Sequence, residues 1–133
     1  QAVWMHYASS GTYMNGTSTY SDITGMSQAI TLASSSSKVI VYMTGGGYSS
    51  TLTRPGFRIT RDGTTVHTVD NIVGHSGAPK VWTGTIIAID SPGSSGSKTY
   101  KLQANSPEGD GYFLRDADGN LAGGSILLIE LAS

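Results

Sequence analysis

The amino-acid sequence predicts an all-β fold, a sandwich or barrel of antiparallel strands. Short runs rich in β-branched and aromatic residues alternate along the 133 residues with clusters of Gly, Ser, Asn and Pro. The chain has 18 Gly, about twice the usual share of roughly 7%. In addition, no segment combines helical periodicity with strong helix formers and capping residues. Together these observations favour roughly eight to ten short strands.

The first strands are expected in the N-terminal half of the chain. They cover 2–8, 18–24, 27–33 and 38–45, and Gly25 is expected to form a turn between the second and the third. Residues 56–69 contain two alternating runs around Asp62-Gly63. A two-residue Asp-Gly pair between such runs is the strongest short signal for a β-hairpin.

The C-terminal half continues the pattern with strands expected at 81–90, 97–105, 112–116 and 125–131. In KTYKLQA, Tyr100 and Leu102 fall on one face, and the intervening polar side chains fall on the other. SILLIEL is nearly continuous in apolar residues. We therefore expect 125–131 to be a central strand covered on both faces, by a second sheet and by a partner subunit.

The stretch PGSSGS separates two of these strands and raises the question of a linker. Because neither flanking strand can bury its apolar face alone, the stretch is predicted to be a hairpin loop. Residues 1–133 are thus expected to form a single domain, and because the sequence begins at Gln1 we expect it to be processed or cut from a longer polypeptide.

The expected strand count also predicts where the connections lie. If every connection reverses the chain, both termini lie at one end of the domain. This count places one group of connections at the opposite end, namely 9–18, 34–37, 62–63, 91–96 and 117–123. It places the remaining connections beside the termini, namely 46–55, 70–80 and 106–111.

Composition argues against several classes of partner. Charged residues make up 13% of the chain and the net charge is −1, so no long-range field that would gather nucleic acid or an anionic membrane is expected. No apolar run approaches the roughly 18 residues needed to span a bilayer. Cysteine is absent, which excludes disulfides and thiolate metal sites. Oligomerisation is the expected alternative source of stability.

The motifs for catalysis and cofactors are weak. His6, His67 and His75 are interpreted as ordinary strand or loop histidines, with a His67/His75 metal pair as the alternative. No G-x-S-x-G nucleophile turn is present. GGGY at 45–48 lacks the Lys-Ser/Thr that completes a phosphate loop. We therefore expect no catalytic residues, no metal and no cofactor.

Acidic residues near the C-terminus leave two alternatives open. Asp116, Asp118 and Asn120 resemble the start of a calcium loop, but the bidentate Glu is missing. Asp-Gly-Asn turn chemistry is favoured there over a cation site. Glu108 and Asp116 are a possible carboxylate pair for glycoside hydrolysis, but two carboxylates among nine acids are expected by chance.

Four stretches carry a resemblance to a known family, and the closing SILLIEL completes it. They are TYSDITGMSQAIT (19–31), SSSSKVIVYMTG (34–45), FRITRDGTTV (57–66) and IDSPGSSGSKTYKLQ (89–103). In this order they resemble the C-terminal jelly-roll heads of bacteriophage tail fibres and related virion proteins, which are similar to C1q and tumour-necrosis-factor domains. The resemblance implies an antiparallel jelly-roll β-sandwich that forms a homotrimer at the end of a stalk, with other virion proteins as partners.

The resemblance supplies no fixed binding residues, so candidates come from the expected loops opposite the termini. Tyr13 lies beside Asn15, and this pair suits stacking on a sugar ring with hydrogen bonds to its hydroxyls. The alternative is a Tyr13 that folds back or contacts a neighbouring subunit. Trp4 and Trp82 are expected in the core or an interface. The remaining loop candidates are Asp62, Ser94, Ser95, Asp118 and Asn120.

Three functions follow as hypotheses. The first is a non-enzymatic virion head that recognises a host surface receptor, either a glycan or an outer-membrane protein. The second is a purely structural virion module, such as a capsid decoration or a fibre trimerisation cap. The third is an enzyme such as a depolymerase, which the weak catalytic motifs do not favour. The first is the function we expect.

Overall fold

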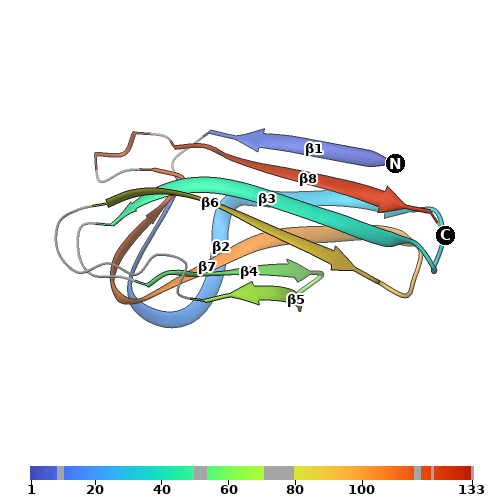
Figure 1. Ribbon diagram of the computed structural model, residues 1–133, viewed down its shortest axis with the longest axis horizontal. Coiled ribbons are helices and arrows are strands. Elements are labelled where there is room, and N and C mark those ends of the chain that lie inside the picture. The colour runs from blue at the N-terminus through green and yellow to red at the C-terminus, as the bar shows by residue number, and fades with distance from the viewer. Residues whose placement is uncertain (9–10, 50–53, 71–79, 116–117, 121, 133) are drawn as a thin grey trace.

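In the part of the chain that it describes, the computed structural model contains eight antiparallel strands (Figure 1). It describes residues 1–133 except 9–10, 50–53, 71–79, 116–117, 121 and 133. In the described part of the chain, no helix is long and apolar enough to cross a membrane. The strands are β1 (Ala2–Tyr7), β2 (Thr12–Leu32), β3 (Lys38–Ser49), β4 (Gly56–Arg61), β5 (Thr64–Val69), β6 (Lys80–Asp90), β7 (Gly96–Phe113) and β8 (Gly124–Leu131).

The strands form two four-stranded layers. The first sheet has the order β1-β8-β3-β6, and the second sheet has the order β2-β7-β4-β5. The layers are joined where the end of β3 pairs with the end of β7, at Gly47↔Phe113 and Tyr48↔Tyr112. This order is that of a jelly roll, so the predicted all-β antiparallel sandwich is confirmed. The prediction of β8 as a central strand is also confirmed, since it pairs with β1 and β3.

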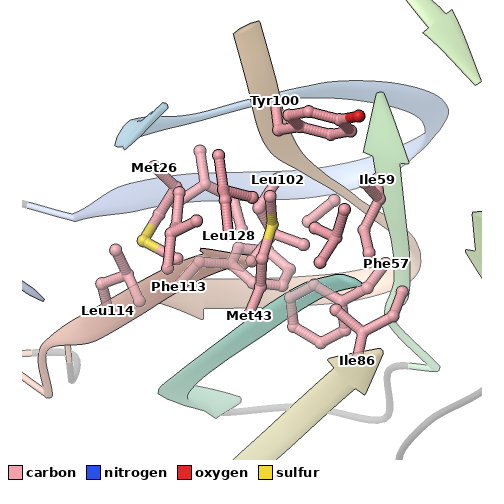
Figure 2. Packing of buried hydrophobic residues seen from close by; sticks show 14 of the residues in the cluster. Met26, Met43, Phe57, Ile59, Ile86, Tyr100, Leu102, Phe113, Leu114 and Leu128 are labelled. Carbon is pink, nitrogen blue, oxygen red and sulfur yellow. The ribbon is translucent and has the colours of Figure 1, made fainter. Parts of the chain in front are cut away.

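The core lies between the two sheets and is built from alternate residues of facing strands (Figure 2). Ile126 and Leu128 of β8 are fully buried there, as are Ile59 of β4 and Tyr100 of β7. Each such aliphatic side chain contributes roughly 1.5–3 kcal/mol on burial. At the junction of the sheets, the rings of Phe57, Trp82 and Phe113 pack edge to face with centroids 5.5–5.6 Å apart. Trp82 is therefore a core residue, as expected.

Strand β2 corrects the prediction of a turn at Gly25. The expected strands 18–24 and 27–33 are one continuous strand, and its pairing with β7 shifts register between Asp22 and Ser27. Gly25 absorbs this irregularity with a φ of +83°, and the Tyr7 ring packs where a Cβ would stand. The glycine thus forms a β-bulge that bends the strand without ending it.

Strand β7 corrects a second expected break. The strands predicted at 97–105 and 112–116 are one strand, which bends from the second sheet to reach β3. Because two expected strand pairs were merged into β2 and β7, the predicted positions of several connections are wrong.

The two ends of the sandwich therefore differ from the predicted arrangement. The N- and C-termini lie at one end, as predicted, because β1 and β8 pair with Ala2 opposite Ile129. The connections 33–37, 62–63 and 91–95 lie at this terminal end and not at the opposite one. The last of them joins β6 of the first sheet to β7 of the second, so the prediction of a hairpin loop there is wrong. The strand ends at Tyr7, Ser49, Val69 and Phe113 lie at the opposite end, which we call the far end (Figure 1). The connections 46–55 and 70–80, expected beside the termini, begin there.

A buried ion pair connects the two sheets near the terminal end. Arg61 of β4 donates two hydrogen bonds to the Asp90 carboxylate of β6, at 2.7 and 2.6 Å. The Tyr100 hydroxyl of β7 donates a third at 2.8 Å. The two charged side chains are only 18% and 11% exposed. Burial raises the pKa of the Tyr100 phenol, and the hydrogen bond to Asp90 raises it further. Since Asp90 belongs to the first sheet and its partners to the second, the network fixes the distance between them.

Candidate functional site

The outer face of the first sheet is apolar over the half next to the termini. Register places Trp4, Leu127, Tyr42 and Ile87 in one row across all four strands. A second row follows two residues along each strand. We call the eight residues of these rows the apolar face: Trp4, Leu127, Tyr42, Ile87, Ala2, Ile129, Ile40 and Ile89.

Several of these side chains are strongly exposed in the single chain. The exposed fractions are 72% for Trp4, 65% for Ile89 and 53% for Ile87. Leu127 and Ile129 of β8 are half-buried. Scattered apolar residues are ordinary on a protein surface, but a contiguous uncharged group of this kind marks an interaction surface. Within the single chain, the second sheet covers the inner side of β8. The partner subunit expected on its outer side stays a prediction.

The outer face of the second sheet is polar and carries an ion pair. Lys101 and Gln103 of β7 donate to the two carboxylate oxygens of Asp22, at 2.7 and 2.8 Å. These hydrogen bonds hold the pKa of Asp22 below its ordinary value, and the one from Lys101 is the stronger cause. The Arg58 guanidinium lies 3.9 Å above the centre of the Tyr20 ring. An open polar depression runs beside these groups and is lined by Asp22, Thr60, Asp62, Gly63, Thr99, Lys101 and Gln103.

Three tyrosines form a row at the far end, where the two sheets join. Tyr13 of β2 lies opposite Tyr112 of β7, which lies opposite Tyr48 of β3. The ring centroids are 4.8 Å apart in the first pair and 5.7 Å in the second. We call these three residues the tyrosine row. Tyr48 lies on the same face of β3 as Tyr42, so the row continues the outer surface beyond the apolar face.

Polar groups surround the tyrosine row. Tyr13 is 47% exposed, and its hydroxyl donates to Asp110 at 2.7 Å. This hydrogen bond raises the pKa of the Tyr13 phenol above its ordinary value. Asn15, two residues further along β2, lies opposite Asp110 on the same face. The Arg115 guanidinium lies 5.2 Å from the centre of the Tyr112 ring.

Glycines make this junction possible. A Cβ at Gly47 would overlap the Tyr112 carbonyl and the Trp82 ring, and one at Gly45 would stand 2.7 Å from Leu114 Cδ2. Real Cβ atoms do not approach a backbone carbonyl so closely, so glycine at position 47 lets β7 reach β3 at this point. The GGGY segment, expected to be a loop beside the termini, is thus the end of β3 at the far end.

The seven sequence-predicted binding candidates do not form one site. Tyr13 and Asn15 lie together in β2 at the far end. Asp62, Ser94 and Ser95 lie at the terminal end, in the turns that follow β4 and β6, which corrects their predicted position. There the Asp62 side chain accepts from Thr99 N of β7 at 2.9 Å, which ties the turn after β4 to β7. The last two candidates are exposed residues between β7 and β8, namely Asp118 and Asn120.

The predicted metal and catalytic alternatives gain no support. His6 is exposed beside Ser125 at 3.2 Å, and His67 is exposed on β5, whereas His75 lies outside the described residues. Among the described residues, no group of three or more metal-ligating side chains comes together. Glu108 lies 3.4 Å from Arg54 in an exposed ion pair. Asp116, its possible partner in hydrolysis, also lies outside the described residues.

The sequence did not single out Tyr48, Tyr112, Asp110 or Arg115. All but Tyr48 lie within or next to SPEGDGYFLR, where Pro and Gly interrupt the alternation and no strand was expected before residue 112. The usable signal was the pair of aromatic residues, Tyr48 and Tyr112, each following a glycine-containing segment. Their opposition depends on the bend of β7, which no local pattern specifies.

Comparison with known proteins gives a match of fold alone. No family model and no curated protein matches the chain. The crystal structure of the infectious bursal disease virus VP2 subviral particle matches with a TM-score of 0.50 and 14% identity, over 97% of this chain. A CBM36-1 domain of a multidomain xylanase from the hindgut metagenome of Trinervitermes trinervoides matches with a TM-score of 0.44 and 14% identity, over 93% of this chain and 96% of that domain.

The chain spans 33% of the length of the VP2 protein that it matches. At 14% identity this likeness supports the jelly-roll fold and transfers no site residues. The fold class is thus established twice, by strand order and by a solved structure. The function must be argued from the surfaces.

Proposed function

We propose that this domain is a non-enzymatic head module of a virus particle, a homotrimer at the tip of a bacteriophage tail fibre that recognises a host surface receptor. The observation that carries the assembly is the apolar face. Its eight residues are all uncharged and cross every strand of the first sheet. Such a face is stabilised when a second copy covers it, because burial yields roughly 25 cal/mol per Å² of apolar surface. The count of three follows the resemblance to trimeric phage heads.

The position of the termini supports the orientation of such a head. Strand β1 begins and strand β8 ends at the terminal end, with Ala2 opposite Ile129. In a trimer whose axis follows the strands, a stalk joined to the termini leaves the far end pointing away from the particle. The far end carries the tyrosine row, whose aromatic and polar groups suit recognition. Receptor contact is therefore proposed there, and not at the turns that contain Asp62, Ser94 and Ser95.

The assembly is tested by the mass of the purified chain in solution. Size-exclusion chromatography with light scattering should give three times the mass of one chain. Ile87→Lys puts a charge in the middle of the apolar face and should yield a folded monomer, because burying an unpaired charge is strongly unfavourable. Ala29→Lys, an exposed change on β2 of the second sheet, is the matched control and should remain trimeric. A wild-type chain that stays monomeric at high concentration contradicts the proposal.

The alternative is a purely structural virion module that uses the same apolar face but has no receptor. The observation in its favour is the continuity of the tyrosine row with the outer surface of the first sheet. Fluorescently labelled trimer incubated with a panel of bacterial strains separates the two. Saturable binding to at least one strain supports the receptor-binding head. A trimer that adsorbs to none supports the structural module.

A further inference from the structure

We propose that the tyrosine row is a carbohydrate-binding platform on which a pyranose ring of a cell-surface glycan stacks against Tyr13. This inference rests on the proposed function and deepens it, because it names the ligand class and the residues that bind it. It selects the glycan over the protein receptor that the sequence left open.

The first argument is the geometry of the rings. Tyr13, Tyr112 and Tyr48 come from three neighbouring strands at one register position, with centroids 4.8 and 5.7 Å apart. Tyr13 is the most exposed member at 47%, whereas Tyr112, which lies beside it, and Tyr48 are half-buried. An aromatic ring held by a neighbouring ring presents an apolar surface at low entropic cost, which suits the C–H groups of a sugar ring.

The second argument is the set of hydrogen-bonding groups at the edge of the row. Asp110 carries acceptor oxygens, and Asn15 carries both a donor and an acceptor on the same face of the β2–β7 pair. Arg115 lies over Tyr112, and its Nε is buried with no hydrogen-bond partner among the described residues. A sugar hydroxyl or carboxylate that approaches Tyr112 would offer acceptors to this guanidinium. Specific sites combine apolar contact with a few such polar groups.

The third argument is the contrast with the apolar face of the first sheet, which the row adjoins through Tyr48 of β3. There Ile87 and Ile89 are aliphatic and offer no hydrogen bonds, and Trp4 and Tyr42 each carry a single polar group. In the tyrosine row every ring carries a hydroxyl, and the neighbours are an acid, an amide and a guanidinium. The first composition is suited to a second copy of the chain. The second composition is suited to a polyhydroxylated ligand that must be oriented as well as desolvated.

The experiment uses the purified chain on a printed array of bacterial lipopolysaccharide and capsular oligosaccharides, with neutral and uronic-acid members. Wild type should bind a subset. Tyr13→Ala should weaken the best binder by about tenfold or more, a ratio that corresponds to about 1.4 kcal/mol. Tyr13→Phe keeps the ring and loses only the hydrogen bond to Asp110, so it should retain most of the affinity. Arg115→Gln should weaken uronic-acid members more than neutral ones.

The matched control is Tyr42→Ala, which removes an exposed tyrosine of the apolar face. It should weaken trimer formation and leave glycan affinity per chain unchanged, so failure of the assembly and failure of the glycan site are read separately. The glycan proposal is overturned if wild type binds no oligosaccharide on the array, or if Tyr13→Ala binds as wild type does. It is also overturned if Tyr13→Ala dissociates the trimer, which would make the row part of the subunit interface.

Discussion

The two outer faces of the sandwich differ in what they expose, although both sheets alternate inward and outward side chains in the same way. On the first sheet, the outward positions near the termini hold Trp4, Tyr42 and Ile87. On the second sheet, they hold Asp22 and Lys101, joined by an ion pair at 2.7 Å. Alternation therefore identifies the side of a strand that faces the core, and the composition of the opposite side indicates whether that face meets water or another protein.

The same contrast separates the two faces by what each would gain from being covered. With only 13% charged residues, the chain places ion pairs on the second sheet and between the sheets, and leaves the eight residues of the apolar face without charge. The polar face gains little from leaving water, since its groups already bond to one another. The apolar face gains roughly in proportion to the area it buries. Assembly through the first sheet can thus supply stability that the core alone does not.

The largest expected effect concerns the ion pair between Arg61 and Asp90, which connects the two sheets. Asp90→Ala should lower the free energy of unfolding by about 3 kcal/mol, because it leaves the mostly buried Arg61 without a counter-charge. Urea denaturation of an Ile87→Lys monomer background, followed by tryptophan fluorescence, measures this without a contribution from assembly. Tyr100→Phe removes one hydrogen bond to the same carboxylate and should cost about 1 kcal/mol. Equal losses in the two variants would mean that the charge pair contributes nothing of its own.

The next effect tests whether the apolar face is an interface. Trp4 is 72% exposed in the single chain, so Trp4→Ala should barely change the stability of an isolated monomer. If copies cover the face, the same change should weaken assembly by about 2 kcal/mol, as expected for a buried aromatic anchor. The measurement is Tm at several protein concentrations. Wild-type Tm should rise with concentration, and the rise should shrink in Trp4→Ala. A Tm independent of concentration in wild type would contradict an interface on this face.

Much of the fold follows from local pattern in the sequence. The Asp62-Gly63 hairpin, the strand of SILLIEL and the burial of Tyr100 and Leu102 were all predicted from alternation or turn chemistry, and the structure confirms them. These features depend on neighbours within a few residues. The long strands β2 and β7 were each predicted as two, because a bulge at Gly25 and a glycine-containing bend near Gly111 look like turns in the sequence.

The candidate site shows the same limit. Tyr13 and Asn15 were predicted to lie side by side in a loop, and they do lie together, but in strand β2. Their partners Asp110 and Tyr112 lie 97 and 99 positions after Tyr13 in the sequence. They reach Tyr13 and Asn15 only because β7 bends around the edge of the sandwich. The predicted grouping with Asp62 and Ser94 is wrong for a related reason. Each missed strand continuation inverts the end at which the following turns lie, so an error of two strands moved whole loops across the molecule.

The smallest expected effect lies on the polar face and completes the contrast. Asp22→Asn should lower the free energy of unfolding by less than about 1 kcal/mol at pH 7, because the Asp22–Lys101 pair is nearly half exposed and screened by solvent. The hydrogen bonds from Lys101 and Gln103 depress the pKa of Asp22 in the folded state, so its contribution is fully present above the unfolded pKa of about 3.9 and is lost as the pH falls through the folded value. The difference between wild type and variant, measured by urea denaturation from pH 6 to pH 2.5, should therefore shrink toward zero in acid. The prediction is contradicted if the difference in free energy of unfolding persists at pH 2.5 or exceeds the effect of Trp4→Ala on assembly.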